Sequence, residues 1–110
     1  MQDIFAEDTG NGIPLVLVHG FLGSSDMWRP QINFFKSNFR VIVPALPGFG
    51  NSSTINSCNS IECMAKAILN LLEKKEIKNF NLLGHSMGGM IVQEMAKVAG
   101  KKILKLICYG

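Results

Sequence analysis

Several features that mark specialised classes of protein are missing from this sequence. Leu15–Val18 is among its longest uninterrupted apolar runs, far short of the ~20 residues that a membrane-spanning helix requires. Met1–Asp8 has neither the basic start nor the apolar run of a signal peptide. We therefore expect a cytoplasmic protein that does not use a membrane.

Cysteine and clustered positive charge are also too scarce to mark a binding site. The cysteines Cys58, Cys63 and Cys108 are odd in number and have no CxxC spacing, so neither a disulfide framework nor a zinc site is predicted and ordinary reduced thiols are expected. The lysines at residues 101–105 are separated by two apolar residues, so we interpret them as solvated surface. We expect no nucleic-acid partner, no metal and no cofactor.

What is present is the composition and patterning of one globular α/β domain. The 110 residues are 47% hydrophobic and 17% charged with a net charge of +3, which fits a single domain over residues 1–110. Short apolar runs alternate with longer helical patterns, which predicts a doubly wound, mostly parallel sheet with helices on both faces. An Asn-Gly turn between the first two strands favours a hairpin. The predicted strands are Asp3–Glu7, Pro14–Val18, Val41–Val43, Phe80–Leu83 and Ile103–Cys108.

Three helical patterns lie between these strands. The first has Trp28, Ile32 and Phe35 at i, i+4 and i+7, although its regular part could begin only at Pro30. The second has the clearest start signal, because Asn59 followed by Glu62 forms a capping box. The third runs from about Ser86 to Ala99, with Gly100 as its stop. The residues predicted on the apolar side of this third helix are Met90, Ile91, Met95 and Val98.

The sharpest motif is GHSMGG at residues 84–89, placed between a predicted strand and a predicted helix. An abrupt strand-to-helix turn forces its central residue into a strained conformation, and small residues two positions to either side let the turn close. Gly84 and Gly88 provide that space, and the turn presents the Ser86 hydroxyl at a helix N-terminus that favours negative charge. We interpret Ser86 as a nucleophile, the alternative being a purely structural glycine-rich turn.

A second strand end carries HGFLGS, directly after Pro14–Val18. Acyl transfer needs two N–H donors aimed at the oxyanion, and the backbones of Phe21 and Met87 are the candidates. Gly20 lets this loop turn close to the site. For His19 we favour a supporting hydrogen bond within the loop over a role as the general base. The Pro- and Gly-rich loop at residues 44–53 is interpreted as a rigid connection without chemistry.

The motifs HGFLGSSDMW, LPGFGNSS and GHSMGG occur in the order and spacing of the α/β-hydrolase superfamily, and the sequence resembles its lidded esterase, thioesterase and carbon–carbon hydrolase branch over essentially all residues. The resemblance implies that Ser86 is the nucleophile and that Phe21 and Met87 donate to the oxyanion. It implies hydrolysis of a small-molecule ester or thioester through an acyl-enzyme. A Ser at position 86 argues against epoxide hydrolases and haloalkane dehalogenases, which resemble this family but carry an Asp there.

The rest of the family's catalytic triad is missing from these residues. In the superfamily the order is Ser, then acid, then His, yet no histidine follows Ser86 and the only later acid is Glu94, about two turns along the helix. His85 is a poor base candidate, because neighbours on such a turn point in different directions. Relatives are about twice this length or more, so we expect residues 1–110 to correspond to the N-terminal half of an enzyme and to be inactive alone. The alternative is a non-catalytic α/β-hydrolase-like binding module.

The last predicted strand, Ile103–Cys108, would end such a sheet. It would expose a row of backbone N–H and C=O groups beside an apolar sequence in which Lys105 is the only charge. Unprotected edges of this kind pair with other chains. We therefore predict self-association through residues 103–108.

Overall fold

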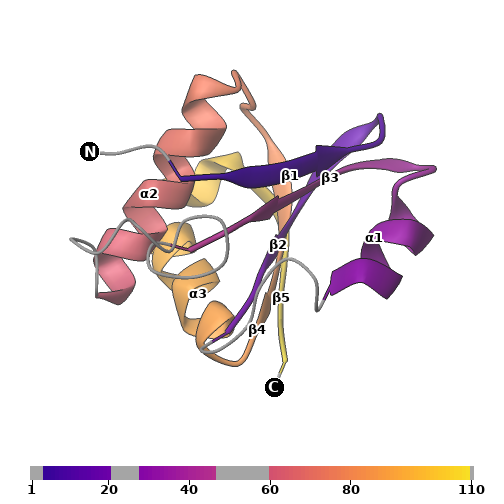
Figure 1. Ribbon diagram of the computed structural model, residues 1–110. Coiled ribbons are helices and arrows are strands. Elements are labelled where there is room, and N and C mark those ends of the chain that lie inside the picture. The colour runs from indigo at the N-terminus through magenta and orange to yellow at the C-terminus, as the bar shows by residue number, and fades with distance from the viewer. Residues whose placement is uncertain (1–3, 21–27, 47–59, 110) are drawn as a thin grey trace.

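One mixed sheet organises the part of the chain that the computed structural model describes, residues 4–20, 28–46 and 60–109. Five strands lie in the order β1-β3-β2-β4-β5, and helices cover both faces (Figure 1). Only the β1–β3 pair is antiparallel. The predicted doubly wound, mostly parallel α/β fold is therefore confirmed. The elements are β1 (Ala6–Thr9), β2 (Ile13–Val18), α1 (Arg29–Phe35), β3 (Phe39–Pro44), α2 (Ile61–Lys74), β4 (Phe80–His85), α3 (Met87–Ala99), the 3₁₀ turn η3 (Gly100–Lys102) and β5 (Ile103–Tyr109).

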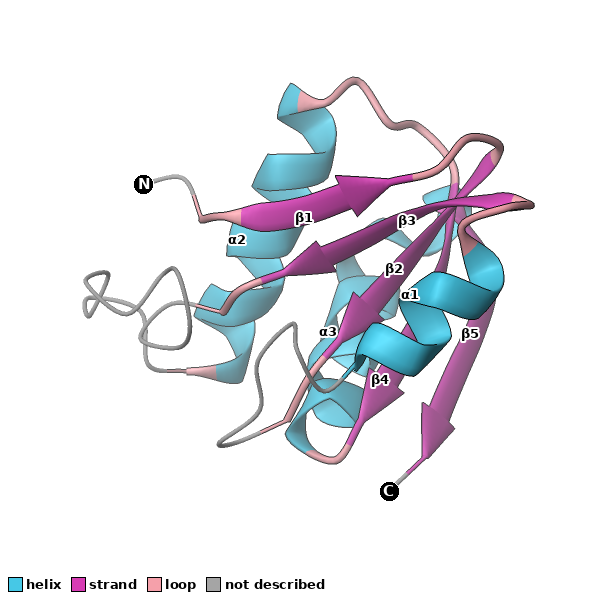
Figure 2. Cartoon of the chain, turned by 45° about the vertical axis from the view of Figure 1, so that its right-hand side comes forward, coloured by secondary structure: helices cyan, strands magenta, loops and turns pink. Residues whose placement is uncertain are grey.

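Two apolar cores lie on the two faces of this sheet. Along β2, Val16 and Val18 belong to the core beneath α2 and α3, while Leu15 and Leu17 belong to the core beneath α1. Figure 2 shows α1 on one side of the sheet and the other two helices behind it. Successive strand residues point to opposite faces, so a strand covered on both sides must be apolar at every position. This arrangement explains the uninterrupted apolar runs of the central strands.

The first strand pairs differently from the prediction. β1 does not form the hairpin with β2 that the Asn-Gly turn favoured; it lies antiparallel to β3, with Ala6 opposite Pro44 and Thr9 opposite Val41. It also begins and ends later than the predicted Asp3–Glu7. The reason is that β2 has a parallel neighbour on each side, β3 and β4, which occupies both of its hydrogen-bonding edges.

Ion pairs fasten the outer strand β1 to the elements around it. Arg29 of α1 bonds to the Glu7 carboxylate at 2.6 and 2.9 Å. Arg40 of β3 bonds to Asp8 at 2.7 and 2.9 Å, and Lys75 reaches the same carboxylate at 2.8 Å. The Arg40 hydrogen bonds, helped by the hydrogen bond from Lys75, outweigh the effect of burial and lower the pKa of Asp8 to about 2. β1 is thus a charged edge.

The start of α2 corrects two predictions. The N-cap is Ser60, whose Oγ accepts a hydrogen bond from the Cys63 N–H at 3.1 Å, so the predicted cap was one residue too early. Asn59 itself lies outside the described residues. Cys63 is disulfide-bonded, which makes the expectation of reduced thiols wrong for this residue, whereas Cys108 is a free thiol.

The apolar side of α3 is narrower than predicted. Ile91 and Met95 are fully buried, but Met90 and Val98 are 54% and 59% exposed. The helix ends at Ala99 as expected, yet Gly100 has a right-handed φ of −55° and leads into η3, so it does not provide a left-handed stop. None of the helices in the described part of the chain has the length and apolar character needed to span a bilayer.

Candidate active site

Ser86 is the single residue between β4, which ends at His85, and α3, which begins at Met87. Its backbone has φ 60° and ψ −121°, a conformation that non-glycine residues rarely adopt. The residue is exposed and is the N-cap of α3, but its side chain makes no capping hydrogen bond. The hydroxyl is therefore held at the carboxyl end of a central strand and at the N-terminus of a helix.

Two glycines let this turn close. A Cβ on Gly84 would overlap the carbonyl oxygen of Gly88, and a Cβ on Gly88 would overlap the carbonyl oxygen of Val18 in β2. The sequence predicted that both positions need a small residue, and the contacts supply the physical reason. Gly89 is different, because a Cβ there would meet the Cys108 Cβ at an ordinary 3.6 Å.

The loop after β2 comes directly against Ser86. Val18 lies opposite Gly84 in the parallel β2–β4 pair, so the two strands end side by side. At Gly20, the next residue but one, an added Cβ would lie 2.8 Å from the Cβ and 3.2 Å from the Oγ of Ser86. A side chain at Gly20 would thus crowd the hydroxyl. Phe21, the predicted second oxyanion donor, lies outside the described residues; Met87, the first, opens α3.

His19 is fully buried and bonds to backbone on two sides. Its Nδ1–H donates to the Gly20 carbonyl at 2.9 Å, and its Nε2 accepts from the Leu46 N–H at 3.3 Å. One neutral tautomer satisfies both contacts, and burial lowers the pKa of the ring below its usual 6.5. The loop-supporting role favoured from the sequence stays a prediction, and these two hydrogen bonds are the contacts on which it would depend. His19 joins the loop after β2 to the segment after β3.

The remaining candidates from the sequence are His85, next to Ser86, and Glu94, eight residues along α3. His85 is half-buried, and its ring meets the buried Trp28 edge-on at a centroid distance of 6.4 Å. Glu94 is half-buried further along α3. His19 and His85 are the chain's only histidines. Within the described residues there is also no group of three or more His, Cys, Asp or Glu side chains that could hold a metal.

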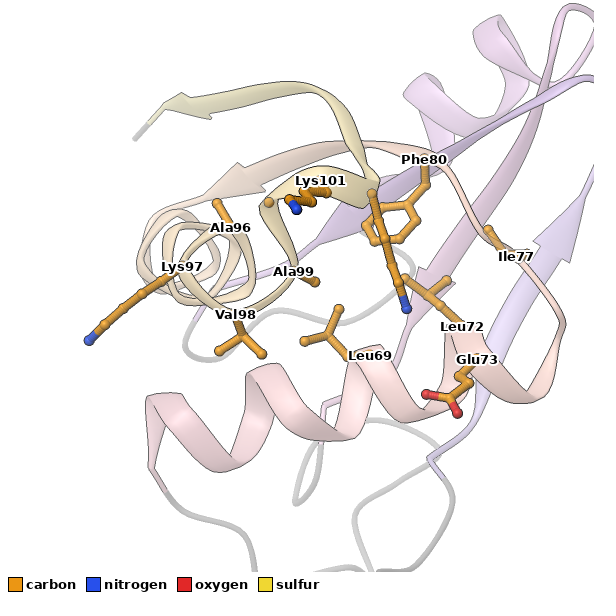
Figure 3. A pocket seen from close by; sticks show the side chains of 12 residues that line it. Leu69, Leu72, Glu73, Ile77, Phe80, Ala96, Lys97, Val98, Ala99 and Lys101 are labelled. Atoms are coloured by element: carbon orange, nitrogen blue, oxygen red, sulfur yellow. The ribbon is translucent and has the colours of Figure 1, made fainter.

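A cavity of about 750 Å³ lies at the opposite end of the sheet (Figure 3). Leu69 and Leu72 of α2, Phe80 at the start of β4 and Val98 of α3 line it, as does η3. In doubly wound sheets, ligands bind beyond the carboxyl ends of the strands, whereas this cavity is near the amino ends of β4 and β5. It is therefore separate from Ser86.

Sequence reasoning missed two backbone groups that build the site. The Leu46 N–H holds His19, and the Val18 carbonyl excludes a side chain at position 88. A third contact joins the Ala45 N–H to the Phe5 carbonyl at 2.8 Å. Nearly every residue type carries the same backbone N–H and C=O groups, so the residue identities at these positions could not predict the contacts. Only the glycines nearby could have indicated them.

Comparison with known proteins agrees with this architecture. The sequence matches the alpha/beta hydrolase fold family over residues 13–110, and the chain belongs to that family. It is 35% identical over 95 residues to a pimeloyl-[acyl-carrier protein] methyl ester esterase of Legionella pneumophila, covering 86% of this chain and 36% of the esterase.

Solved esterase structures superpose closely on the described fold. A thermophilic esterase from Thermogutta terrifontis has a TM-score of 0.90 at 37% identity, covering 96% of this chain and 39% of that one. A marine microorganism esterase has a TM-score of 0.91 at 30% identity, with 96% and 41% covered. The chain thus matches the N-terminal part of these relatives and spans about two-fifths of their length.

Proposed function

We propose that this chain carries the nucleophile and oxyanion hole of a serine hydrolase that acts on small-molecule esters or thioesters. The observation that carries the proposal is Ser86, exposed at φ 60° between β4 and α3 and facing Gly20, where any side chain would crowd its hydroxyl. The names of the matched relatives, esterases among them, support the reaction class. They differ too much in chemistry to assign a particular substrate.

In the proposed reaction, the Ser86 Oγ attacks the carbonyl carbon while a general base takes its proton. The carbonyl oxygen becomes an oxyanion that accepts hydrogen bonds from the N–H groups of Met87 and Phe21. The intermediate collapses, the alcohol or thiol leaves with a proton, and water then hydrolyses the acyl-enzyme. No cofactor takes part.

The base and the orienting acid would have to come from residues outside this sequence. Both ring nitrogens of His19 contact the backbone, and no histidine follows Ser86. Loss of a triad member lowers the rate by ~10⁴-fold or more. We expect residues 1–110 alone to hydrolyse a p-nitrophenyl ester at a negligible rate. A rapid reaction that Ser86→Ala abolishes would show instead that a histidine within residues 1–110 acts as the base.

The decisive test uses the protein encoded by the whole coding sequence. A fluorophosphonate probe is expected to label it, and Ser86→Ala should abolish labelling and ester hydrolysis while leaving the circular dichroism spectrum unchanged. Ser60→Ala is a matched control: it removes the hydroxyl that caps α2 and should lower stability by about 1 kcal/mol but keep labelling. Labelling that persists in Ser86→Ala would reject the proposed nucleophile.

The second candidate is a non-catalytic α/β-hydrolase-like module that binds a small molecule. A complete, folded protein that neither reacts with the probe nor hydrolyses esters would support this alternative. A cytoplasmic location and the lack of a nucleic-acid partner remain predictions from the sequence.

A further inference from the structure

The cavity at the end of the sheet opposite Ser86 has walls from α2, β4, α3 and η3. β4 lies between β2 and β5 in the sheet, and α2 and α3 share one apolar core with it. Among the described residues that line the cavity none belongs to β5, so the open edge of that strand has no part in it. The volume of about 750 Å³ lies within the ~300–1,000 Å³ that is usual for small-molecule sites. The cavity is therefore large enough for a small organic molecule.

The interior of this cavity is apolar. Leu72 of α2 and Phe80 of β4 line it and are each only 1% exposed, so they form its inner end. Leu69 of α2 and Val98 of α3 line the part nearer to solvent, and Val98 is 59% exposed. Figure 3 shows Leu69 and Val98 in the gap between the two helices. A hydrocarbon chain placed there would remove this apolar surface from water.

The mouth of the cavity carries positive charge. β5 begins opposite Phe80, so Lys101 and Lys102 of η3, just before β5, stand at the end of the sheet that Phe80 closes. Both lysines are exposed, and neither takes part in an ion pair within the described residues. Glu73 is the single acidic residue of the lining, and Lys97 points away from the cavity in Figure 3. Two ammonium groups against one carboxylate favour an anionic group at the mouth.

We propose that this cavity binds a fatty carboxylate of medium chain length, with its hydrocarbon chain between α2 and α3 and its carboxylate at Lys101 and Lys102. The apolar interior and the cationic mouth match the two halves of such a molecule. Burial of the chain is favourable, and the ammonium groups donate charge-assisted hydrogen bonds to the carboxylate. A neutral hydrocarbon would fit only the interior, and a small anion would fit only the mouth.

This binding site is distinct from the proposed hydrolase chemistry. Phe80 begins the six-residue strand β4 and Ser86 follows its last residue, so a rise of ~3.3 Å per residue puts the two sites roughly 20 Å apart. At that distance a ligand in the cavity does not touch the Ser86 hydroxyl. The two proposals therefore stand or fall separately.

Isothermal titration calorimetry of sodium decanoate into the protein encoded by the whole coding sequence tests the proposal. We expect one saturable site with a dissociation constant on the order of 1 mM or tighter. The double variant Lys101→Glu/Lys102→Glu reverses the charge at the mouth and should weaken binding at least tenfold. Lys36→Glu makes the same change at an exposed lysine at the end of α1, on the other face of the sheet, and should bind like wild type.

Two further ligands test the two halves of the site. Acetate keeps the carboxylate without the chain, and decyltrimethylammonium keeps the chain but carries the opposite charge. Each should bind at least tenfold more weakly than decanoate, because each makes only one of the two kinds of contact. Binding of decyltrimethylammonium as tight as that of decanoate would reject the role of the lysines.

Ala99→Phe separates this cavity from the Ser86 site. Ala99 lines the cavity at the end of α3, and a phenyl ring there would occupy the space of the hydrocarbon chain. Decanoate binding should fall at least tenfold, whereas probe labelling and ester turnover should not change. Circular dichroism checks that each variant folds, and the lysine double variant alone decides if Ala99→Phe does not.

Three results would overturn the proposal: no decanoate binding by the wild-type protein, binding that survives in the lysine double variant, or equal weakening by Lys36→Glu. Decanoate that binds at the Ser86 site instead would give the second of these results. An enzymatically inactive protein that binds decanoate through Lys101 and Lys102 would reject the hydrolase proposal and leave this one intact.

Discussion

Two turns in the described chain place a non-glycine residue at φ 60°: Ser86 at the start of α3 and Glu76 just after α2. At Glu76 the local helix end explains the conformation, because the Glu76 N–H donates to Glu73 and the Ile77 N–H donates to Leu72, each at 2.9 Å. This is the Schellman pattern, which normally uses glycine. Around Ser86 the close contacts come from other elements, since a Cβ at Gly20 would lie 2.8 Å from the Ser86 Cβ and a Cβ at Gly88 would overlap the Val18 carbonyl oxygen.

The comparison teaches that backbone strain alone does not mark a functional site. Both residues are exposed and both have the same φ. Only Ser86 combines that φ with a nucleophilic hydroxyl, glycines that no larger residue could replace, and a place at the carboxyl ends of parallel strands. Crowding from distant segments distinguishes the Ser86 turn from the Glu76 turn.

The largest expected effect comes from adding one methyl group beside Ser86. In Gly88→Ala the new Cβ meets the Val18 carbonyl oxygen, a backbone atom that cannot move aside, and overpacking of this kind costs about 3 kcal/mol. Gly89→Ala should be neutral or stabilise by up to about 1 kcal/mol, because its Cβ finds ordinary space in a helix interior. Urea unfolding followed by circular dichroism measures both. Equal effects at the two neighbours would contradict the crowded turn.

Contacts between backbone groups of distant segments are the part of the structure that the sequence could not predict. The apolar runs of β2, β3 and β4 and the GHSMGG motif predicted the sheet, its helices and the position of Ser86, because both depend on side-chain pattern. The pairing of β1 with β3 and the bond between Leu46 and His19 depend on backbone groups brought together by the whole fold. Local sequence carries no information on such long-range partners.

An intermediate effect is expected from protonation of His19. Burial lowers the pKa of this ring below its usual 6.5 in the folded chain. At a pH between the pKa of the folded state and that of the unfolded state, the unfolded state therefore binds more protons. Stability should therefore be complete above about pH 6.5 and fall as the pH drops below it, by at most about 1.4 kcal/mol per pH unit. A protonated Nε2 can no longer accept from the Leu46 N–H, so acid should loosen the loop beside Ser86.

His19→Gln separates this effect from general acid sensitivity. An amide oxygen can accept a hydrogen bond but does not titrate. We expect the variant to be less stable than wild type at pH 8 but to lose little further stability between pH 7 and pH 5. Unfolding free energies measured at several pH values provide the test. Parallel pH profiles for the variant and the wild type would show that His19 is not the titrating group.

The smallest expected effect returns to the Glu76 turn. Glu76→Gly should stabilise the chain by about 1 kcal/mol, because glycine adopts a positive φ without steric cost and keeps both Schellman hydrogen bonds. Lys66→Gly, at an exposed position in the middle of α2, should instead destabilise by about 1 kcal/mol. Ser86→Gly also removes a side chain from a residue of positive φ and should stabilise the chain, yet it removes the proposed nucleophile. Urea unfolding measures all three variants. If Ser86→Gly destabilised the chain while Glu76→Gly did not, the Ser86 side chain would have to make a stabilising contact that outweighs its backbone strain.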